Sequence, residues 1–501
     1  MPQNLISATA TAVFIVGPLL AILINNLLPR TLAQKICLKV GIAATLLQIA
    51  AVCSCVWLFF ANSSYHISFS VFWNMSAQPG AARFYVDFLS LTVMLAIGLV
   101  SLVSLLTANE SIKDKALNFS NLLMICMIGM NGLVMVNDLF SLYIFLEITG
   151  IAAFVLIALL REERGLEGAF KYLAMSAIAS VFLLASLALI FMETGDLHFA
   201  NVAALLSSPA QASQPLLLMI ASLFFITAFS IKAAMVPFHG WLPDAYQSAP
   251  AAVSVLLGGI VTKAAGVYAI IRVLSGAFSG VLAGVFSHVQ NVHVVFAILG
   301  LVSILYGAIA AIGQRDMKRM LAYSSISQMG YIVLGAATGS VIGLVGAALH
   351  FFNHATFKGT LFVNAAALEK QTGSTDLEVL PCGLQARMPL TAISSMLAFF
   401  STAGIPPLAG FWSKFLIILA VWQSGSPLMA GLALLASIIT AAYFLRIQRK
   451  VFFGQPDDSS NEITEVKGSL ALAEWLLSII TVGCGLLFPA LLLLMQSKGL
   501  F

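Results

Sequence analysis

Long apolar segments recur along almost the whole chain, and they constrain the fold more than any other feature. A helix needs about 20 apolar residues to cross the hydrocarbon core of a bilayer. Charged residues make up only 9% of the 501 residues, against roughly 25% in soluble domains. We therefore predict an all-α polytopic membrane protein that forms a single transmembrane domain over residues 1–501. Its fourteen predicted transmembrane helices begin near residues 5, 40, 86, 118, 138, 167, 217, 250, 291, 317, 341, 389, 427 and 468.

The distribution of Lys and Arg between successive loops predicts the orientation of the chain. Cytoplasmic loops carry an excess of these residues. One predicted side collects 17 of the 24 Lys and Arg residues, Lys113 and Lys318 among them. The opposite side has three, which are Arg83, Arg272 and Lys498. The asymmetry places both termini on the non-cytoplasmic side, and it agrees with an even number of spans.

Four lysines remain, and all of them lie well inside predicted spans: Lys232, Lys263, Lys358 and Lys414. Glu147 lies in the middle of the fifth span. Each charge at the centre of a bilayer costs at least about 2.5–3.5 kcal/mol. Snorkelling suits Lys171 and Arg272 near helix ends. A structural ion pair or a snorkelling side chain explains a single charge inside a span more readily than five at similar depth. We therefore predict that these five residues carry protons.

Two predicted spans are interrupted by proline. The seventh contains Pro237 and the twelfth contains Pro406 and Pro407, and each break lies within two turns of a lysine. Proline removes an amide donor, so the freed carbonyl groups must face protein or water. Paired breaks in two halves are typical of ion sites between internal repeats, whereas a single break also fits a plain proline kink. We predict inverted repeats at approximately residues 118–276 and 291–452, with helices 7 and 12 broken.

The eleventh span carries His350, His354 and Lys358 at four-residue steps, which places them on one helical face. Two histidines at this spacing could bind zinc or haem, but the face offers no thiolate or carboxylate partner. We therefore predict no metal. A proton relay and a polar contact between helices both remain as interpretations, because histidine titrates near neutral pH.

Other polar residues are weaker candidates. Asp138 and Glu474 lie near span ends, and we interpret them as interfacial or capping residues rather than ion ligands. The secondary polar candidates are Asp138, His239, Asp244 and His350. The six cysteines form no CxxC motif, and no dinucleotide-binding or phosphate-binding fingerprint is present. We predict no cofactor in this chain.

Several runs resemble one family of membrane proteins. They are residues 137–147, which end at Glu147; HGWLPDA at 239–245; RDMKR at 315–319 with AYSSISQ at 322–328; NHATFK at 353–358; and GIPP at 404–407 with Gly410 and Phe411. Together they are similar to the antiporter-like subunits of respiratory complex I, of Mrp-type cation/proton antiporters and of membrane-bound energy-converting hydrogenases. The resemblance covers nearly the whole chain.

The resemblance implies a role for each buried charge. Glu147 and Lys232 look like the glutamate–lysine pair of the input half-channel, and Lys263 looks like the connecting lysine. His354 with Lys358 resembles the relay toward the output, and Lys414 the terminal residue. The M-type subunit of complex I has glutamate at this last place. The lysine here favours an Mrp D-type, hydrogenase-type or N-type relative.

These features lead to one predicted function and two alternatives. We predict a proton-translocating membrane subunit of a multisubunit Mrp-type Na⁺/H⁺ antiporter in a prokaryotic cell membrane. Its predicted partners are other membrane subunits, protons, Na⁺ as a further candidate ion and lipid, with no nucleic acid. The alternatives are a proton-pumping subunit of a redox complex, either a hydrogenase or an NADH:quinone oxidoreductase, and a non-conducting scaffold subunit. Because no redox or hydrolytic centre is recognisable, the chain alone is not predicted to be a complete enzyme.

Overall fold

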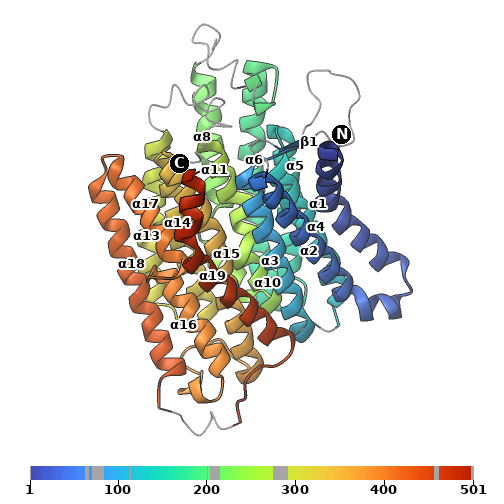
Figure 1. Ribbon diagram of the computed structural model, residues 1–501, viewed down its shortest axis with the longest axis vertical. Coiled ribbons are helices and arrows are strands. Elements are labelled where there is room, and N and C mark those ends of the chain that lie inside the picture. Colours follow the sequence, from blue (N-terminus) through green and yellow to red (C-terminus); the bar gives the residue numbers. More distant parts are fainter. Residues whose placement is uncertain are drawn as a thin grey trace. The chain divides into compact units, whose positions relative to one another are not determined.

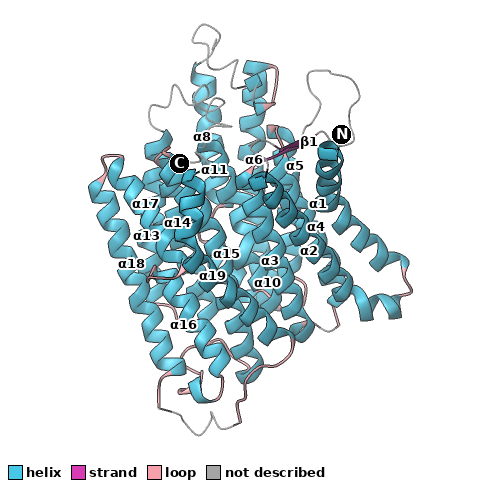
Figure 2. Cartoon of the chain, viewed as in Figure 1, coloured by secondary structure: helices cyan, strands magenta, loops and turns pink. Residues whose placement is uncertain are grey.

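The computed structural model describes residues 2–61, 67–69, 84–112, 114–199, 201–202, 215–274, 292–455 and 462–497. These residues are almost entirely helical (Figure 2), which confirms the predicted all-α class. One short antiparallel ribbon was not predicted: β1 (Ile67–Phe69) pairs with β2 (Phe84–Val86). The predicted loop cations Arg83, Lys113 and Lys498 lie outside the described residues.

The chain divides into two compact units. The first unit comprises Met1–Leu105, Asp114–Ala233 and Val261–Val292. Its main elements (Figure 1) are α1 (Pro2–Leu27), α2 (Arg30–Ala61), most of α3 (Phe88–Ser111), α4 (Ala116–Met135), α5 (Leu139–Ile157), α6 (Glu163–Thr194), α8 (Pro215–Lys232), the π-helix η2 (Lys263–Tyr268) and α11 (Ala269–Leu274).

The second unit comprises Leu106–Lys113, Ala234–Ile260 and His293–Phe501. Its elements are α9 (Trp241–Ser248), α10 (Ala251–Leu256), most of the π-helix η1 (Leu257–Val261), α13 (Val292–Ile312), α14 (Met317–Ala337), α15 (Val341–Thr372), η3 (Leu384–Ala386), α16 (Pro389–Ala403), α17 (Ala409–Gln423), α18 (Pro427–Ile447), the π-helix η4 (Gln448–Phe452) and α19 (Ser469–Ser497).

Within the described residues, nine helical segments are long and apolar enough to cross a membrane. The five other predicted spans are α1, α8, the broken pair α16 and α17, and the more polar helices α14 and α15. Both predicted helix breaks are present: α8 ends at Lys232 before α9 begins at Trp241, and α16 ends at Ala403 before α17 begins at Ala409. The chain is thus a multi-pass membrane protein with broken helices 7 and 12.

One local arrangement occurs twice, at positions 178 residues apart. Asp138 caps α5 and forms a backbone bridge with His198, while Asp316 caps α14 and forms a bridge with Asp376. The helices that follow α5 and α14 are α6 and α15. Each has 32 residues, and each ends at a glycine in the left-handed backbone conformation. This correspondence supports internal repetition, because each feature has a counterpart in the other half. The inverted relation of residues 118–276 and 291–452 stays a prediction.

Candidate functional site

The first unit brings together the predicted pair Glu147 and Lys232. Nζ of Lys232, the last residue of α8, donates to Glu147 Oε1 on α5 at 3.1 Å. The same ammonium donates to Ser176 Oγ on α6 at 2.8 Å, and the Ser180 hydroxyl donates to Glu147. The Lys232 side chain is 5% exposed and that of Glu147 is 27% exposed. The result is a compact ion pair, with two hydroxyl groups that complete its hydrogen bonding.

A glycine makes room for this pair. A Cβ atom added at Gly150, three residues after Glu147, would lie 3.3 Å from Ser176 Oγ and 3.8 Å from Lys232 Nζ. A larger side chain there would therefore crowd the ammonium group. The C-terminus of α8 also favours a cation, since the helix dipole places partial negative charge at that end.

Lys263 lies in the same unit, and its side chain is fully buried. It begins η2, which continues a stretch of π-helix in the middle of the eighth predicted span. Gly266 of η2 packs directly against the backbone at Lys232 and Ala233, where a Cβ atom would clash. This close approach joins the segment that carries Lys263 to the end of α8. π-helical turns inside α-helices are frequent at functional sites.

Arg272 corrects a prediction, because it does not snorkel from a helix end. Its side chain is buried, and its guanidinium forms an ion pair with Asp87, just before α3. Nε also donates to the Tyr268 hydroxyl at 2.6 Å, and Nη2 donates to Ser90. The first unit therefore contains a second buried ion pair. The count of loop cations did not predict this ion pair, because Asp87 lies at the start of the third predicted span.

The second unit holds Lys414 in a different environment. From α17, its Nζ donates to the backbone oxygen of Thr402 at 2.7 Å and to Ser437 Oγ at 3.1 Å. The ammonium lies 4.5 Å from the centroid of the Tyr331 ring, in a cation–π contact. Within the described chain, no carboxylate comes within 4 Å of this Nζ. Lys414 is buried, and neutral acceptors satisfy its ammonium group.

The predicted face of α15 is buried in the second unit, and the rings of His350 and His354 lie 6.4 Å apart between centroids. Both ring nitrogens of His350 have protein partners: Nδ1 contacts Ser413 Oγ at 2.9 Å and Nε2 contacts Gln328 Oε1 at 3.2 Å. His350 therefore fits a polar contact between helices, and neither nitrogen is left to bind a metal. The His354 ring packs on Phe357 at 5.2 Å between centroids.

Lys358, one turn further along α15, is fully buried. Its Nζ donates to the backbone oxygen of Leu321 at 3.1 Å and lies 5.8 Å from the centroid of the Phe444 ring. Like Lys414, it has an oxygen acceptor and an aromatic ring beside its ammonium group. Neutral acceptors therefore accompany both predicted lysines of the second unit.

The helix breaks and the secondary candidates also have defined contacts. In the first break, the amide of Val236, next to Pro237, donates to Ser303 Oγ at 3.0 Å. In the second, the Gly410 amide after Pro406 and Pro407 donates to Ser401 Oγ at 3.1 Å.

The secondary polar candidates also have defined contacts. The His239 ring meets Tyr306 edge-on, and Asp244 forms an ion pair with Arg319. Asp138 accepts the Ser141 amide at 2.7 Å as the N-cap of α5, which agrees with its interpretation as a capping residue.

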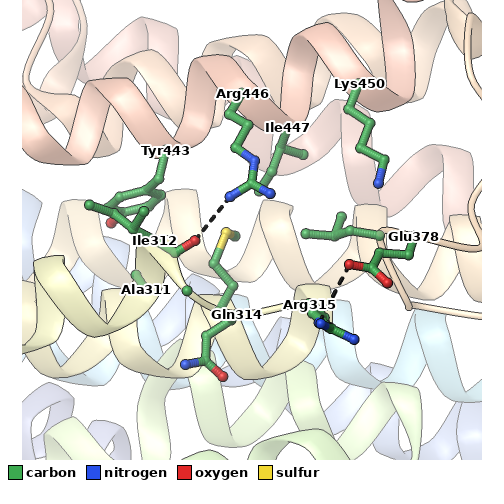
Figure 3. A pocket seen from close by; sticks show the side chains of 12 residues that line it. Ala311, Ile312, Gln314, Arg315, Glu378, Tyr443, Arg446, Ile447 and Lys450 are labelled. Carbon is green, nitrogen blue, oxygen red and sulfur yellow. Dashed lines mark hydrogen bonds and ion pairs between the residues drawn. The ribbon is translucent and has the colours of Figure 1, made fainter.

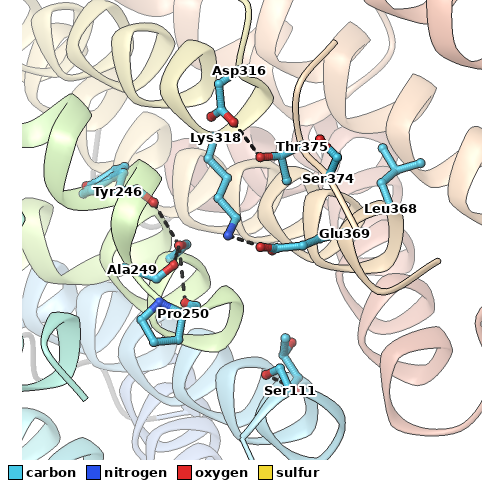
Figure 4. A network of polar contacts seen from close by, with 12 residues as sticks. Ser111, Tyr246, Ala249, Pro250, Asp316, Lys318, Leu368, Glu369, Ser374 and Thr375 are labelled. Atoms are coloured by element: carbon cyan, nitrogen blue, oxygen red, sulfur yellow. Dashed lines mark hydrogen bonds and ion pairs between the residues drawn. The ribbon is translucent and has the colours of Figure 1, made fainter. Parts of the chain in front are cut away.

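Lys318 corrects a second prediction. Counted as a loop cation, it is instead buried on α14, and its Nζ lies 2.7 Å from Glu369 Oε2 on α15. Figure 4 shows this ion pair beside the hydrogen bond from Thr375 to Asp316. That hydrogen bond connects the start of α14 to the segment after α15. Because Lys318 lies only two residues inside its helix, position along the sequence did not reveal its burial.

Glu474 corrects a third prediction, because it is fully buried on α19 rather than interfacial. The Thr391 hydroxyl lies 3.3 Å from Glu474 Oε2 and 2.8 Å from Glu465 Oε1. The amide of Asn364, oriented to donate, lies 2.8 Å from Glu474 Oε1. Within the described chain no cation lies within 4 Å of this carboxyl. An ionised carboxylate without a cation is costly to bury.

The fold and its buried charges define a multi-pass membrane protein with ionisable groups inside its helical units. A family profile described as "NADH:quinone oxidoreductase/Mrp antiporter, TM" matches residues 136–440. This match covers more than half of the chain, so the protein belongs to that family.

Individual relatives come from more than one kind of complex. The N-type subunit of the NADH-quinone oxidoreductase of Desulforudis audaxviator is 38% identical over 330 residues, which cover 66% of this chain and 64% of the relative. The D-type subunit of the Na(+)/H(+) antiporter of Alkalihalophilus pseudofirmus is 32% identical over 345 residues, or 69% of this chain and 67% of the relative.

A solved structure matches the fold over almost its full length. A chain of the membrane-bound sulfane sulfur reductase, an archaeal respiratory membrane complex, has a TM-score of 0.84 at 26% identity. The superposition covers 99% of this chain and 97% of that chain. The described helices therefore follow an architecture found in a respiratory membrane complex.

Proposed function

We propose that this chain translocates protons as one membrane subunit of a multisubunit complex. The observation that carries the proposal is the buried ion pair of Lys232 with Glu147, framed by the hydroxyls of Ser176 and Ser180. Charges inside membrane spans are costly, and they commonly mark ion or proton pathways. The family match supports the same function, since the relatives include subunits of a proton-coupled antiporter and of a quinone-linked dehydrogenase.

The pair can control the protonation of Lys232. An adjacent carboxylate favours the charged form of a lysine, whereas burial favours the neutral form. While Glu147 stays at 3.1 Å, the lysine holds its proton. If the two side chains separate, burial dominates and the proton leaves. We propose that Lys263 accepts this proton, because η2 packs against the end of α8.

The second unit provides the later steps of the proposed route. His354 and Lys358 act as a relay, and Lys414 is the terminal site. Because neutral oxygens hold Lys414, its deprotonation would leave no carboxylate without a partner. The assignment of these three residues rests on the family resemblance together with their burial.

Two assemblies are candidates for the complex. An Mrp-type Na⁺/H⁺ antiporter in a prokaryotic cell membrane agrees with Lys414 at the terminal position and with the antiporter relative. A redox-driven complex is the second candidate, favoured by the 38% identity to a subunit of an NADH-quinone oxidoreductase and by the respiratory complex of similar fold. In both, the proposed partners are other membrane subunits, and both termini face the non-cytoplasmic side. Purification of the complex from its source and identification of its components distinguishes them, because only a redox complex contains cofactor-bearing subunits.

Proton transport by the complex in sealed vesicles tests the proposed function. Glu147→Gln and Lys232→Ala should each reduce proton transport strongly, because each removes one member of the pair. Lys171→Gln is the matched control, since Lys171 forms an exposed ion pair with Glu167 on α6. Wild-type transport rates in both site variants would overturn the proposal and would favour the scaffold alternative.

A further inference from the structure

A cationic cavity of about 310 Å³ opens in the second unit where α13 ends, α14 begins and α18 continues into η4. Its charged lining residues are Arg315, Arg446, Lys450 and Glu378 (Figure 3). Three cations and one carboxylate give the lining a formal charge of +2. None of these residues belongs to the proposed proton route.

Most hydrogen-bond donors of these cations have no acceptor in the described chain. Arg446 donates one bond, from Nη1 to the backbone oxygen of Ile312 at 3.1 Å. Arg315 Nε lies 3.4 Å from Glu378 in an exposed ion pair, and the Lys450 side chain forms no hydrogen bond or ion pair within the described residues. A guanidinium carries five N–H groups and an ammonium three. The cavity thus presents many cationic donors, which suits a ligand with several anionic oxygen atoms.

Figure 3 shows where these donors lie. Arg446 and Lys450 reach from the segment of α18 and η4 toward the turn that contains Gln314 and Arg315. Arg446 and Lys450 are four residues apart, so they lie on one helical face. A phosphate group placed between this face and the turn would meet donors from both sides.

Exposed apolar side chains lie on both helices, and one of them, Ile312, lines the cavity itself. Ile309 and Ile312 near the end of α13 are 60% and 42% exposed, and Ile438 and Leu445 on α18 are 62% and 52% exposed. On membrane-crossing helices such side chains suit contact with acyl chains, while Lys and Arg at helix ends reach the headgroup level. Basic pockets between helices on the cytoplasmic side bind anionic headgroups. The loop charges predict that this end of α13 and α18 is cytoplasmic.

We propose that this cavity binds the phosphate group of an anionic phospholipid. Arg446, Lys450 and Arg315 donate to the phosphate oxygens, and the acyl chains lie along the apolar ends of α13 and α18. A free phosphate ion would use the same donors, but it would gain nothing from the apolar side chains beside the cavity. The proposal concerns lipid binding, so it does not depend on which ion the protein transports.

Lipid binding to the full chain in phosphatidylcholine nanodiscs tests this site, with phosphatidylglycerol added as the probe. Each positive charge near a membrane surface contributes about 1 kcal/mol to the binding of anionic lipid, which is roughly fivefold in affinity per charge. Arg446→Gln with Lys450→Gln should therefore weaken phosphatidylglycerol binding by roughly 25-fold. Native mass spectrometry of the released complexes measures the bound lipid directly. Lys450→Gln alone should weaken binding roughly fivefold, and it removes no hydrogen bond or ion pair of the described chain.

The matched control is Arg449→Gln with Lys467→Gln. It removes the same charge from exposed positions of the same unit that do not line the cavity, and its phosphatidylglycerol binding should stay within about twofold of wild type. An equal loss in this control would overturn the proposal, because the effect would then be general surface charge. Wild-type binding by both cavity variants would also overturn it. Displacement of the lipid by inorganic phosphate alone would assign the site to a free anion instead.

Discussion

Two buried lysines, one in each unit, are stabilised in different ways. In the first unit, Lys232 contacts Glu147 directly. In the second unit, Lys414 contacts a backbone oxygen and a serine hydroxyl, while the buried carboxyl of Glu474 contacts a threonine and an asparagine. The second unit therefore contains an acid and a base that are each held by neutral groups. A paired lysine stays charged as long as its partner stays close, whereas a lysine held by neutral acceptors can exchange its proton without leaving an unpaired charge.

The largest expected effect on stability is a difference between substitutions of Lys232 and of Lys414. Lys232→Met leaves Glu147 without its cation, and breaking a buried pair in this way costs about 3 kcal/mol or more. The 27% exposure of Glu147 places the expected loss near the lower end of that range. Lys414→Met leaves only neutral groups, so we expect a loss of about 1–2 kcal/mol. Unfolding of the purified variants measures both, and equal losses would contradict the comparison.

Double variants test whether each lysine is energetically coupled to an acidic residue of its own unit. Adding Glu147→Gln to Lys232→Met should recover about 1–3 kcal/mol, because groups in direct contact are energetically coupled. Lys414→Met with Glu474→Gln should instead be additive within about 0.5 kcal/mol, since the two residues share no partner. Strong coupling in the second pair would mean that the acid and base of the second unit interact after all.

The two helix breaks differ at one backbone position. Gly404 has φ of +83° after α16, whereas Ala234 has φ of +51° after α8. The left-handed conformation costs an L-residue roughly 1–2 kcal/mol. Gly404→Ala should therefore destabilise the protein by about that amount, and its Cβ would also lie 3.1 Å from Cδ of Lys414. Ala234→Gly should stabilise it by up to about 1 kcal/mol, and thermal unfolding of both variants would show shifts of opposite sign.

The smallest expected effect concerns the repeated caps. Asp138→Ala and Asp316→Ala should each cost about 1 kcal/mol, the usual contribution of an N-cap. Similar losses would support the correspondence of α5 with α14. Asp316 has an additional bond from Thr375 at 2.5 Å, so Asp316→Ala is expected to be the more damaging. A clear loss at one cap and none at the other would contradict the correspondence.

Apolar length and proline position made much of the fold predictable. Both follow from simple rules: a span needs about 20 apolar residues, and proline interrupts a helix. The contact of Glu147 with Lys232 agrees with the resemblance, which had paired them across 85 residues of sequence. The ribbon of β1 and β2 was missed, because its strands are three residues long and lie between apolar segments.

Burial near helix ends could not be predicted from position alone. Arg272 was interpreted as a snorkelling side chain, Lys318 as a loop cation and Glu474 as interfacial or capping, yet each is buried. Their environments depend on tertiary neighbours from other helices: Asp87 for Arg272, Glu369 for Lys318, and Thr391 with Asn364 for Glu474. A sequence pattern reports depth along a helix axis, but it does not report which neighbouring helix covers a residue. Long-range partners of opposite charge were the missing information.

One pair of isosteric substitutions tests the central claim most directly. Glu147→Gln and Glu474→Gln each replace a carboxyl with an amide of the same size, but only Glu147 contacts a lysine in the structure. Proton transport by the complex in sealed vesicles should fall strongly with Glu147→Gln and stay near the wild-type rate with Glu474→Gln. Equal rates in the two variants, or a loss confined to Glu474→Gln, would contradict the assignment of the proton pathway to the pair of Glu147 and Lys232.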